Sequence, residues 1–301
     1  MANGMTHISV CICTYKRPQL LMRLLCHLGK QETDDLFTYS IVVADNDHLR
    51  SAEATVAAFR ETSPIPVVYC VEPRQNIALA RNMSVEQATG DFVAFIDDDE
   101  FPSPRWLVTL LTTCQSYRVD GVLGPVKPHF DERPPAWVQK GRFYDRPTYP
   151  TGLVIDRRKG RTGNTILKRS LFDMEGPPFR PEFRTGEDQD FFRRMIEKGH
   201  VFIWCDEAVA FEVVPPARWR RGFMIRRALL RGTVSLEHPD MGSRDIVRSV
   251  VAAAFYAVSL PFAALLGQAR FLVCLVKLCD HAGRLFAVAG IDLVKDSYVT
   301  E

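Results

Sequence analysis

The sequence predicts an α/β fold in which a mostly parallel sheet is covered by helices on both faces. Three observations support this prediction: strand-like and helix-like segments alternate in the N-terminal part of the chain, the strand candidates are almost wholly apolar, and a polar residue directly follows each of them. Alternating segments are typical of parallel sheets, and strands buried on both faces are continuous runs of Val, Ile and Phe. Ligands bind such sheets at the carboxyl ends of the strands.

The expected elements follow one another along the chain. Strands are expected at 8–13, 40–44, 67–71 and 92–96, with helices between them at 18–30, 52–61 and 77–88. Shorter strands are expected at 153–155 and 165–167, and a further helix runs from about residue 185 to Gly199, a natural C-terminal stop. The polar residues that follow the first four strands are Thr14, Asp45, Glu72 and Asp97. Their meeting at one sheet edge favours a ligand site over four unrelated loop residues.

Four successive acids, Asp97-Asp98-Asp99-Glu100, follow the fourth strand. They require a counter-charge, and carboxylate oxygens at such an edge are suited to Mg²⁺ or Mn²⁺. The alternative is an acidic turn before a helix N-terminus at Ser103-Pro104, where acids are also favourable. No GxGxxG follows the first strand and no GxxxxGK[ST] occurs, so the usual dinucleotide and P-loop motifs are absent from the sequence.

Composition limits the classes of protein that fit. The 301 residues can form one large or two modest domains, and 38 basic and 36 acidic residues nearly cancel to a net charge of +2, which gives no indication of nucleic-acid binding. The eight cysteines form no CxxC pair or Cys/His cluster, which favours reduced thiols in a cytoplasmic setting. The apolar stretch 8–13 is too short for a signal-peptide core, so export is not expected.

Two later regions have unusual composition. Residues 127–150 are rich in proline and aromatic residues, including Trp137, which predicts an ordered functional flap. Six arginines and no acid lie between Arg218 and Arg231, interleaved with apolar residues, and predict a basic amphipathic helix with an anionic partner. The uncharged segment 249–267 then reaches the lower end of membrane-span length, so a span, a re-entrant segment, an interfacial helix and a buried helix all stay open.

Five motifs in order make the chain resemble the family-2 inverting glycosyltransferases with the GT-A nucleotide-sugar fold, similar to bacterial enzymes of exopolysaccharide and lipid-linked glycan synthesis. The resemblance covers about residues 8 to 215. The motifs are Val10-Cys11-Ile12-Cys13-Thr14-Tyr15-Lys16-Arg17-Pro18, Ile41-Val42-Val43-Ala44-Asp45-Asn46, Asn76-Ile77-Ala78-Leu79-Ala80-Arg81-Asn82 with Gly90-Asp91 and the DxD acids Asp97-Asp98-Asp99, Gly163-Asn164, and Gly186-Glu187-Asp188.

The resemblance implies roles for particular residues. The donor nucleotide would be held by Thr14, Tyr15, Asp45, Arg81, Asp97 and Asp98, and Mn²⁺ or Mg²⁺ by Asp99 and Asp97. Asp188 would be the general base, ionised at a helix N-terminus, although Thr185 with an acid three residues later is also close to a capping box. The acceptor side would include Asn164, Glu187, Trp137 and Arg218. Where the family often has a histidine near the metal, this chain has Glu212, so a metal contact there is open.

The resemblance also implies an activity. The expected enzyme transfers one sugar, with inversion, from a nucleotide-sugar donor, first of all a UDP-sugar, to a lipid-linked glycan acceptor. The QxxRW motif of processive synthases is incomplete, because Pro215 stands before Arg218-Trp219 in place of glutamine. Residues 1–215 would form the catalytic domain, and 216–301 helices on the cytoplasmic face of a membrane, peripheral or shallowly inserted. The alternatives are a sugar-nucleotidyltransferase, which would be expected to have a glycine-rich first loop, and a non-catalytic nucleotide-sugar-binding scaffold.

Overall fold

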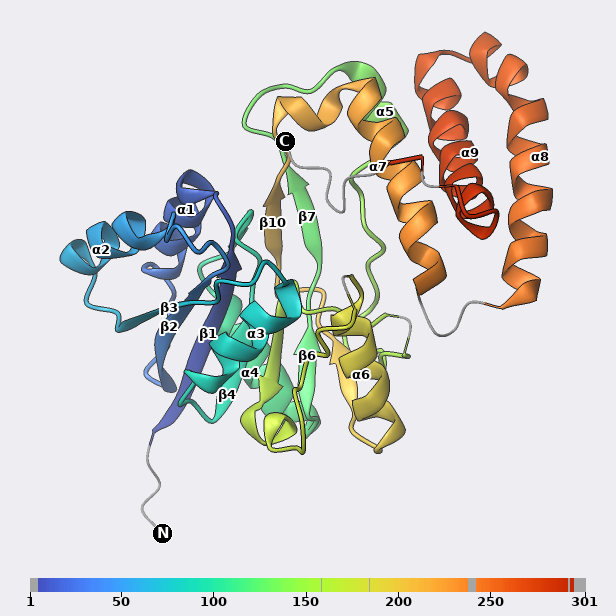
Figure 1. The fold of residues 1–301 in the computed structure, drawn as a ribbon. Helices are drawn as coiled ribbons and strands as arrows, with labels where there is room; N and C mark the ends of the chain where they lie inside the picture. The colour runs from blue at the N-terminus through green and yellow to red at the C-terminus, as the bar shows by residue number, and fades with distance from the viewer. Residues whose placement is uncertain (1–4, 158, 184, 238–241, 292, 295–301) are drawn as a thin grey trace. The chain divides into compact units, whose positions relative to one another are not determined.

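The computed structural model describes residues 5–157, 159–183, 185–237, 242–291 and 293–294. The chain divides into two units, Met1–Pro128 with Arg146–Val213, and His129–Asp145 with Val214–Glu301 (Figure 1). The last of the three boundaries in the sequence, after Val213, lies two residues before the expected one at 215. Residues 129–145, expected as a flap of the first domain, belong to the second unit.

The first unit is built on a seven-stranded sheet with strand order β3-β2-β1-β4-β8-β6-β9. Its strands are β1 (Thr6–Thr14), β2 (Phe37–Asp45), β3 (Val67–Val71), β4 (Phe92–Phe95), β6 (Gly121–Leu123), β8 (Thr165–Lys168) and β9 (Phe202–Trp204). The first four are parallel and β8 is antiparallel to its neighbours β4 and β6, so the predicted mostly parallel sheet is confirmed. Thr14 pairs with Asp45, which brings these strand ends together. The strand expected at 153–155 is reduced to a single bridge from Val154.

Helices cover both faces of this sheet. They are α1 (Pro18–Leu28), α2 (Glu53–Thr62) and α4 (Trp106–Tyr117) on one face, and α3 (Ile77–Glu86) and α6 (Glu187–Glu197) on the other. Side chains alternate between the two cores along each strand: Ala94 and Ile96 join the first core, and Val93 and Phe95 the second. Burial on both faces is the physical reason for the continuous apolar runs in the sequence.

A second, three-stranded sheet has the order β5-β10-β7, with β5 (Glu100–Pro102), β10 (Ala210–Val213) and β7 (Val126–His129). The acid run forms a turn at Asp98 and Asp99 and then leads into β5, so the acidic-turn alternative is right about the turn, but α4 begins at Trp106 and not at Ser103-Pro104. The antiparallel pairing of β5 with β10 sets Glu100 opposite Glu212.

The second unit is helical. It contains α5 (Ala136–Gly141), the 3-10 helices η2 (Pro216–Trp219) and η3 (Ser235–Glu237), α7 (Arg221–Val234), α8 (Ser243–Leu265) and α9 (Gln268–Val288). Helices α7 and α9 approach closely, since a Cβ on Gly232 would lie 2.1 Å from the backbone oxygen of Asp280. Arg231 donates hydrogen bonds of 2.9 and 3.1 Å to the Asp280 carboxylate, which fixes the same crossing. The expected basic helix is thus present and packs through small residues.

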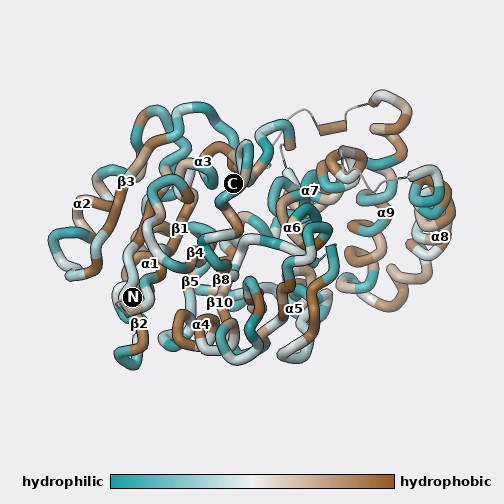
Figure 2. Tube along the Cα trace, turned by 90° about the horizontal axis from the view of Figure 1, so that it is seen from below, coloured by the Kyte–Doolittle hydropathy of each residue, from teal (hydrophilic) through white to brown (hydrophobic). Residues whose placement is uncertain are grey.

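Helix α8 is rich in apolar residues, which are brown along its trace (Figure 2). Among the described helices it is the one that is long and apolar enough to cross a membrane by length and composition, and 11% of its apolar window is buried. Its exposed large side chains are Val247, Val250, Val251, Phe255, Val258, Phe262 and Leu265. The buried-helix alternative for 249–267 is therefore wrong.

Candidate active site

The acid run after β4 is neutralised by arginines from separate segments. Arg17, directly before α1, lies 3.1 Å from Asp98 and 3.3 Å from Asp99. The hydroxyl of Thr14, at the end of β1, donates a 2.8 Å hydrogen bond to Asp98. The connection between β1 and α1 thus contacts two of the four acids, and Arg17 supplies a counter-charge to both of them.

Arg81 on α3 connects the acid run to the start of α6. One guanidinium nitrogen lies 3.6 Å from Asp97 and another forms an ion pair with Glu187. The position of α3 is fixed at its N-terminus, where the Asn76 side chain accepts hydrogen bonds from the amides of Ala78 and Leu79. Both Arg81 and Glu187 are buried, so each needs the other's charge.

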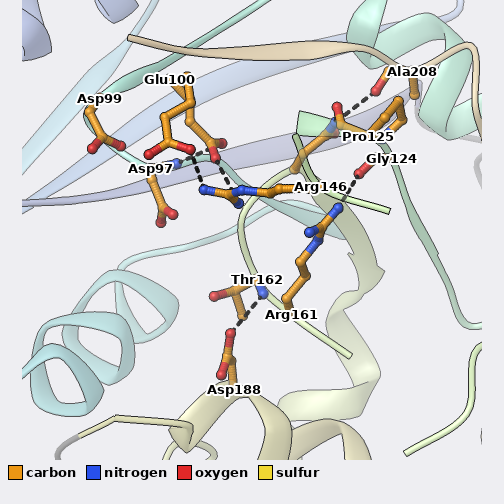
Figure 3. Close-up of polar contacts among 12 residues, drawn as sticks. Asp97, Asp99, Glu100, Gly124, Pro125, Arg146, Arg161, Thr162, Asp188 and Ala208 are labelled. Atoms are coloured by element: carbon orange, nitrogen blue, oxygen red, sulfur yellow. Dashed lines mark hydrogen bonds and ion pairs between the residues drawn. The ribbon is translucent and has the colours of Figure 1, made fainter. Parts of the chain in front are cut away.

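Glu100 and Glu212 share a third arginine. Arg146 forms an ion pair with Glu212 and lies 3.9 Å from Glu100 (Figure 3). Burial and the charge of Asp97 raise the pKa of Glu100 well above its ordinary value, although Arg146 opposes the shift. Glu212, for which the sequence leaves a metal contact open, thus has Arg146 as a cationic partner.

The pKa values of Asp97 and Asp98 are also raised. The side chain of Asp97 is 46% exposed, but the surrounding protein reduces the hydration of its carboxylate. The reduced hydration and the charge of Asp99 raise the pKa of Asp97, and the charge of Arg81 opposes this rise. Burial and the charge of Asp99 raise the pKa of Asp98 to about 7, against Arg17 and Thr14. The described part of the chain contains no group of three His, Cys, Asp or Glu side chains arranged for a metal. Two carboxylates that repel each other still fit Mg²⁺ or Mn²⁺, which take their other ligands from water and phosphate.

Asp188 lies in the first turn of α6. One carboxylate oxygen accepts a 3.3 Å hydrogen bond from the backbone amide of Thr162, and the other accepts from the amide of Gln189 (Figure 3). The N-cap is Gly186 with a φ of 83°, and no side chain caps the helix. The capping-box alternative for Thr185 and Asp188 is therefore wrong.

An aromatic cluster holds α6 on the sheet. Phe191 stacks on Phe172 with ring centroids 5.4 Å apart, and Phe192 meets Phe202 of β9 edge to face at 4.9 Å. Both α6 rings are fully buried. Burial of one such ring stabilises a fold by about 1.5–3 kcal/mol, so the orientation of α6, and with it Asp188, is strongly fixed.

The Gly163-Asn164 motif is a close-packed junction. Asn164 is fully buried; its amide oxygen accepts from the Trp106 indole at 2.6 Å, and its amide nitrogen donates to the backbone oxygens of Pro125 and Ala208. A Cβ on Gly163 would lie 3.1 Å from the Asp97 carboxylate. The side-chain hydrogen bonds of Asn164 are thus made within the protein, and Gly163 leaves space for the acid run.

The other predicted residues lie as follows. The Asp45 carboxylate is fully buried and accepts hydrogen bonds from the Ala52 amide at 2.8 Å and the Tyr69 hydroxyl at 2.9 Å. Tyr15 follows Thr14 at the same sheet edge. Trp137 on α5 and Arg218 on η2 belong to the second unit.

Sequence reasoning missed three arginines, Arg17, Arg146 and Arg161. The need for a counter-charge to four acids was the available signal, but it does not say which of many arginines supplies it. Arg161 was detectable only by its place two residues before the Gly163-Asn164 motif.

Comparisons with known proteins show the family and the fold. A family model described as "Glycosyl transferase family 2" matches residues 9–175. The chain is similar to the "Succinoglycan biosynthesis protein ExoM" of Rhizobium meliloti (strain 1021), with 35% identity over 234 residues, covering 77% of this chain and 75% of the relative.

Solved structures share the fold. The mannosyltransferase PcManGT from Pyrobaculum calidifontis, in complex with GDP-Man and Mn²⁺, has a TM-score of 0.63 at 18% identity, covering 95% of this chain and 88% of that chain. S. aureus TarS 1-349 in complex with UDP has a TM-score of 0.54 at 16% identity, covering 94% and 90%. This chain spans 55% of a longer S. aureus TarS structure. The predicted GT-A-like α/β fold is confirmed.

Proposed function

The chain belongs to glycosyltransferase family 2, and on this basis we propose that it transfers a single sugar from a nucleotide-sugar to a glycan hydroxyl with inversion at the anomeric carbon. Inversion follows from one displacement, in which the acceptor oxygen bonds to the anomeric carbon as the bond to the diphosphate breaks. The reaction needs a base for the hydroxyl proton and positive charge for the leaving diphosphate.

The observation that carries this proposal is that Asp188 lies in the same unit as the acid run Asp97-Asp98-Asp99-Glu100 and its arginine partners. Its carboxylate is oriented by the Thr162 amide, and no cation among the described residues is paired with it. An oriented carboxylate without an ion-pair partner is suited to accept the proton of an attacking hydroxyl.

Divalent metal fits the acid run. Asp97 and Asp99 would hold Mg²⁺ or Mn²⁺, which would neutralise charge developing on the leaving diphosphate. Two carboxylates are enough for these ions when substrate phosphate and water complete the shell. Reduced hydration and the charge of Asp99 raise the pKa of Asp97, and a divalent cation relieves that repulsion.

The donor nucleotide would bind at the carboxyl ends of β1 and β2. Thr14, Tyr15 and Asp45 would contact its base and ribose, and Arg81, Asp97 and Asp98 would lie toward its phosphates. UDP-sugars are the first candidates. The fold-level neighbours have been solved with UDP, UDP-GlcNAc and GDP-Man, which supports a nucleoside diphosphate without choosing among them.

For the acceptor we propose a lipid-linked glycan on the cytoplasmic face of a membrane, in a polysaccharide pathway. The similarity to a succinoglycan biosynthesis protein and the exposed apolar side of α8 support it. Trp137 and Arg218 of the second unit are proposed acceptor-side residues, whereas Asn164 and Glu187 would position other groups through the contacts described above.

A panel of nucleotide-sugars tests the proposed function. The full-length protein in Mn²⁺ should release nucleoside diphosphate from one donor well above the others, and excess chelator should stop the release. A protein that releases none from any donor would contradict enzymatic function and favour the non-catalytic scaffold.

A further inference from the structure

Arg161 is a further arginine of the site, and no carboxylate of the described residues forms an ion pair with it. Arg161 directly precedes Thr162, whose amide orients Asp188, and its side chain extends toward Gly124 and Arg146 (Figure 3). We propose that Arg161 binds an anionic group, a carboxylate or phosphate, on the acceptor next to the attacking hydroxyl. This inference rests on the proposed function and adds a specificity-determining residue to it.

The contacts of Arg161 leave most of its hydrogen-bonding capacity unused. Its one hydrogen bond within the described residues is a long one of 3.5 Å to the Gly124 carbonyl, and none of their carboxylates forms an ion pair with it. Its Nε is buried without a hydrogen-bond partner among them. The guanidinium packs over the buried Trp204 ring, 5.3 Å from the centroid, which holds it in place. Arg161 as a whole is half-buried, but its Nε is shielded from water and has no ion-pair partner to compensate, so binding of an anion would be favourable.

Two neighbouring features strengthen this reading. The Oγ1 atom of Thr162, next in sequence, is also buried without a hydrogen-bond partner in the described structure. Arg146 lies close enough for its charge, together with burial, to lower the pKa of Arg161. Arg146 forms ion pairs with Glu100 and Glu212, whereas Glu100 and Asp188 act on Arg161 only through their charge, without an ion pair.

Position assigns the anion to the acceptor. The donor side already has Arg17 and Arg81 against the acid run, together with the proposed metal. Arg161 instead belongs to the segment that orients Asp188, and the charge of Asp188 acts on it. Whatever gives its proton to Asp188 is the acceptor hydroxyl, so a group within reach of Arg161 lies on the acceptor. A planar guanidinium binds carboxylate and phosphate equally well in a bidentate manner.

The test compares three simple acceptor probes with the full-length protein, the active donor and Mn²⁺: methyl glucoside, methyl glucuronide and a phosphorylated methyl glucoside. The variants are R161M, which removes the charge, R161K, which keeps it without the planar fork, and R118M as a control at an exposed arginine of the same unit. Wild type should prefer one or both anionic probes, and which one it prefers identifies the anion. R161M should lower kcat/KM for that probe by about 10- to 100-fold relative to the neutral probe, and R161K by less, the size expected from hydrogen bonds to a charged group.

UDP affinity, measured by calorimetry, should stay within about twofold of wild type in R161M, given a tenfold change per 1.4 kcal/mol. Equal use of neutral and anionic probes by wild type, or an equal loss on all three in R161M, would overturn the inference alone. Loss of UDP affinity would assign Arg161 to the donor diphosphate and also overturn it. If wild type hydrolyses no nucleotide-sugar, the proposed function fails and the inference fails with it.

Discussion

Glu100 and Glu212 lie directly opposite each other in the antiparallel pair of β5 and β10. Like charges in this arrangement destabilise a sheet. Both residues are buried, so water cannot screen them. The side chain of Arg146 makes the arrangement tolerable by contacting both carboxylates. Arg146, which belongs to the proline-rich segment, is thereby held next to Glu100, the last residue of the acid run.

Replacing Arg146 should destabilise the protein. R146M removes the cation that contacts two buried carboxylates, a change that costs about 3–5 kcal/mol for a fully buried pair. Because 32% of the Arg146 side chain is exposed, we expect about 2 kcal/mol, read from the midpoint of urea unfolding. R146M/E212Q should recover about half of the loss, since one repelling charge is removed. An R146M midpoint equal to that of R118M would show that the arginine does not stabilise this sheet.

Asp99 should be needed for metal-dependent donor binding. D99N removes one of the two proposed ligands while keeping the side-chain shape, so the Mn²⁺-dependent part of UDP affinity should fall by about tenfold or more. D35N, a change of the same kind at an exposed aspartate, should leave it unaltered. Calorimetry with Mn²⁺ and with chelator separates the two contributions. UDP binding and sugar transfer that persist fully in chelator would show that the arginines alone serve the diphosphate.

Asp120 should contribute to the acid limit of stability. Burial raises its pKa, but the Val201 amide at 3.1 Å and the Lys168 ammonium at 3.0 Å outweigh this and hold the pKa below its ordinary value. A depressed pKa stabilises the fold above the unfolded-state value, about 3.9, and this stabilisation is lost as the pH falls through the lower folded value.

D120N should therefore be less stable than wild type at neutral pH by about 1 kcal/mol, and the difference should shrink below about pH 4. Urea unfolding of both proteins across this pH range measures it. A difference that is constant with pH would mean that the charge of Asp120 does not matter.

The strands that could be predicted from the sequence are those whose own residues report their burial. The first four strands were found within three residues at either end because their apolar runs report burial directly. The pairing of Glu100 with Glu212 could not be found, because it depends on contacts between segments far apart in the chain. Thr185 failed as a helix cap because Gly186, with its positive φ, takes the N-cap position.

Membrane attachment should depend on both α7 and α8. Of the six arginines between 218 and 231, Arg218 is buried and Arg231 is bonded to Asp280, so fewer charges face solvent than the sequence implied. R220Q/R221Q should weaken binding to anionic vesicles about 30-fold at low salt, at about 1 kcal/mol per arginine, and much less at high salt. R60Q/R118Q, with the same loss of charge in the first unit, serves as the control.

Substitution in the apolar side of α8 should act differently. F255Q/V258Q replaces two exposed apolar residues, so vesicle binding should fall at both low and high salt, because burial of apolar surface is not screened. Cosedimentation with vesicles measures both effects. If full-length protein stays in the supernatant with anionic vesicles at low salt, the second unit is not a membrane anchor.

The central claim is that Asp188 takes the proton from the acceptor hydroxyl, and the most direct measurement is the transfer rate of D188N at saturating donor. The amide keeps the shape and can still accept from the Thr162 amide, but it cannot take the proton. The account predicts a loss of kcat of about 10²- to 10⁴-fold with UDP affinity and thermal midpoint close to wild type, while E197Q, at the exposed end of α6, transfers normally. Transfer by D188N at nearly the wild-type rate would contradict the claim.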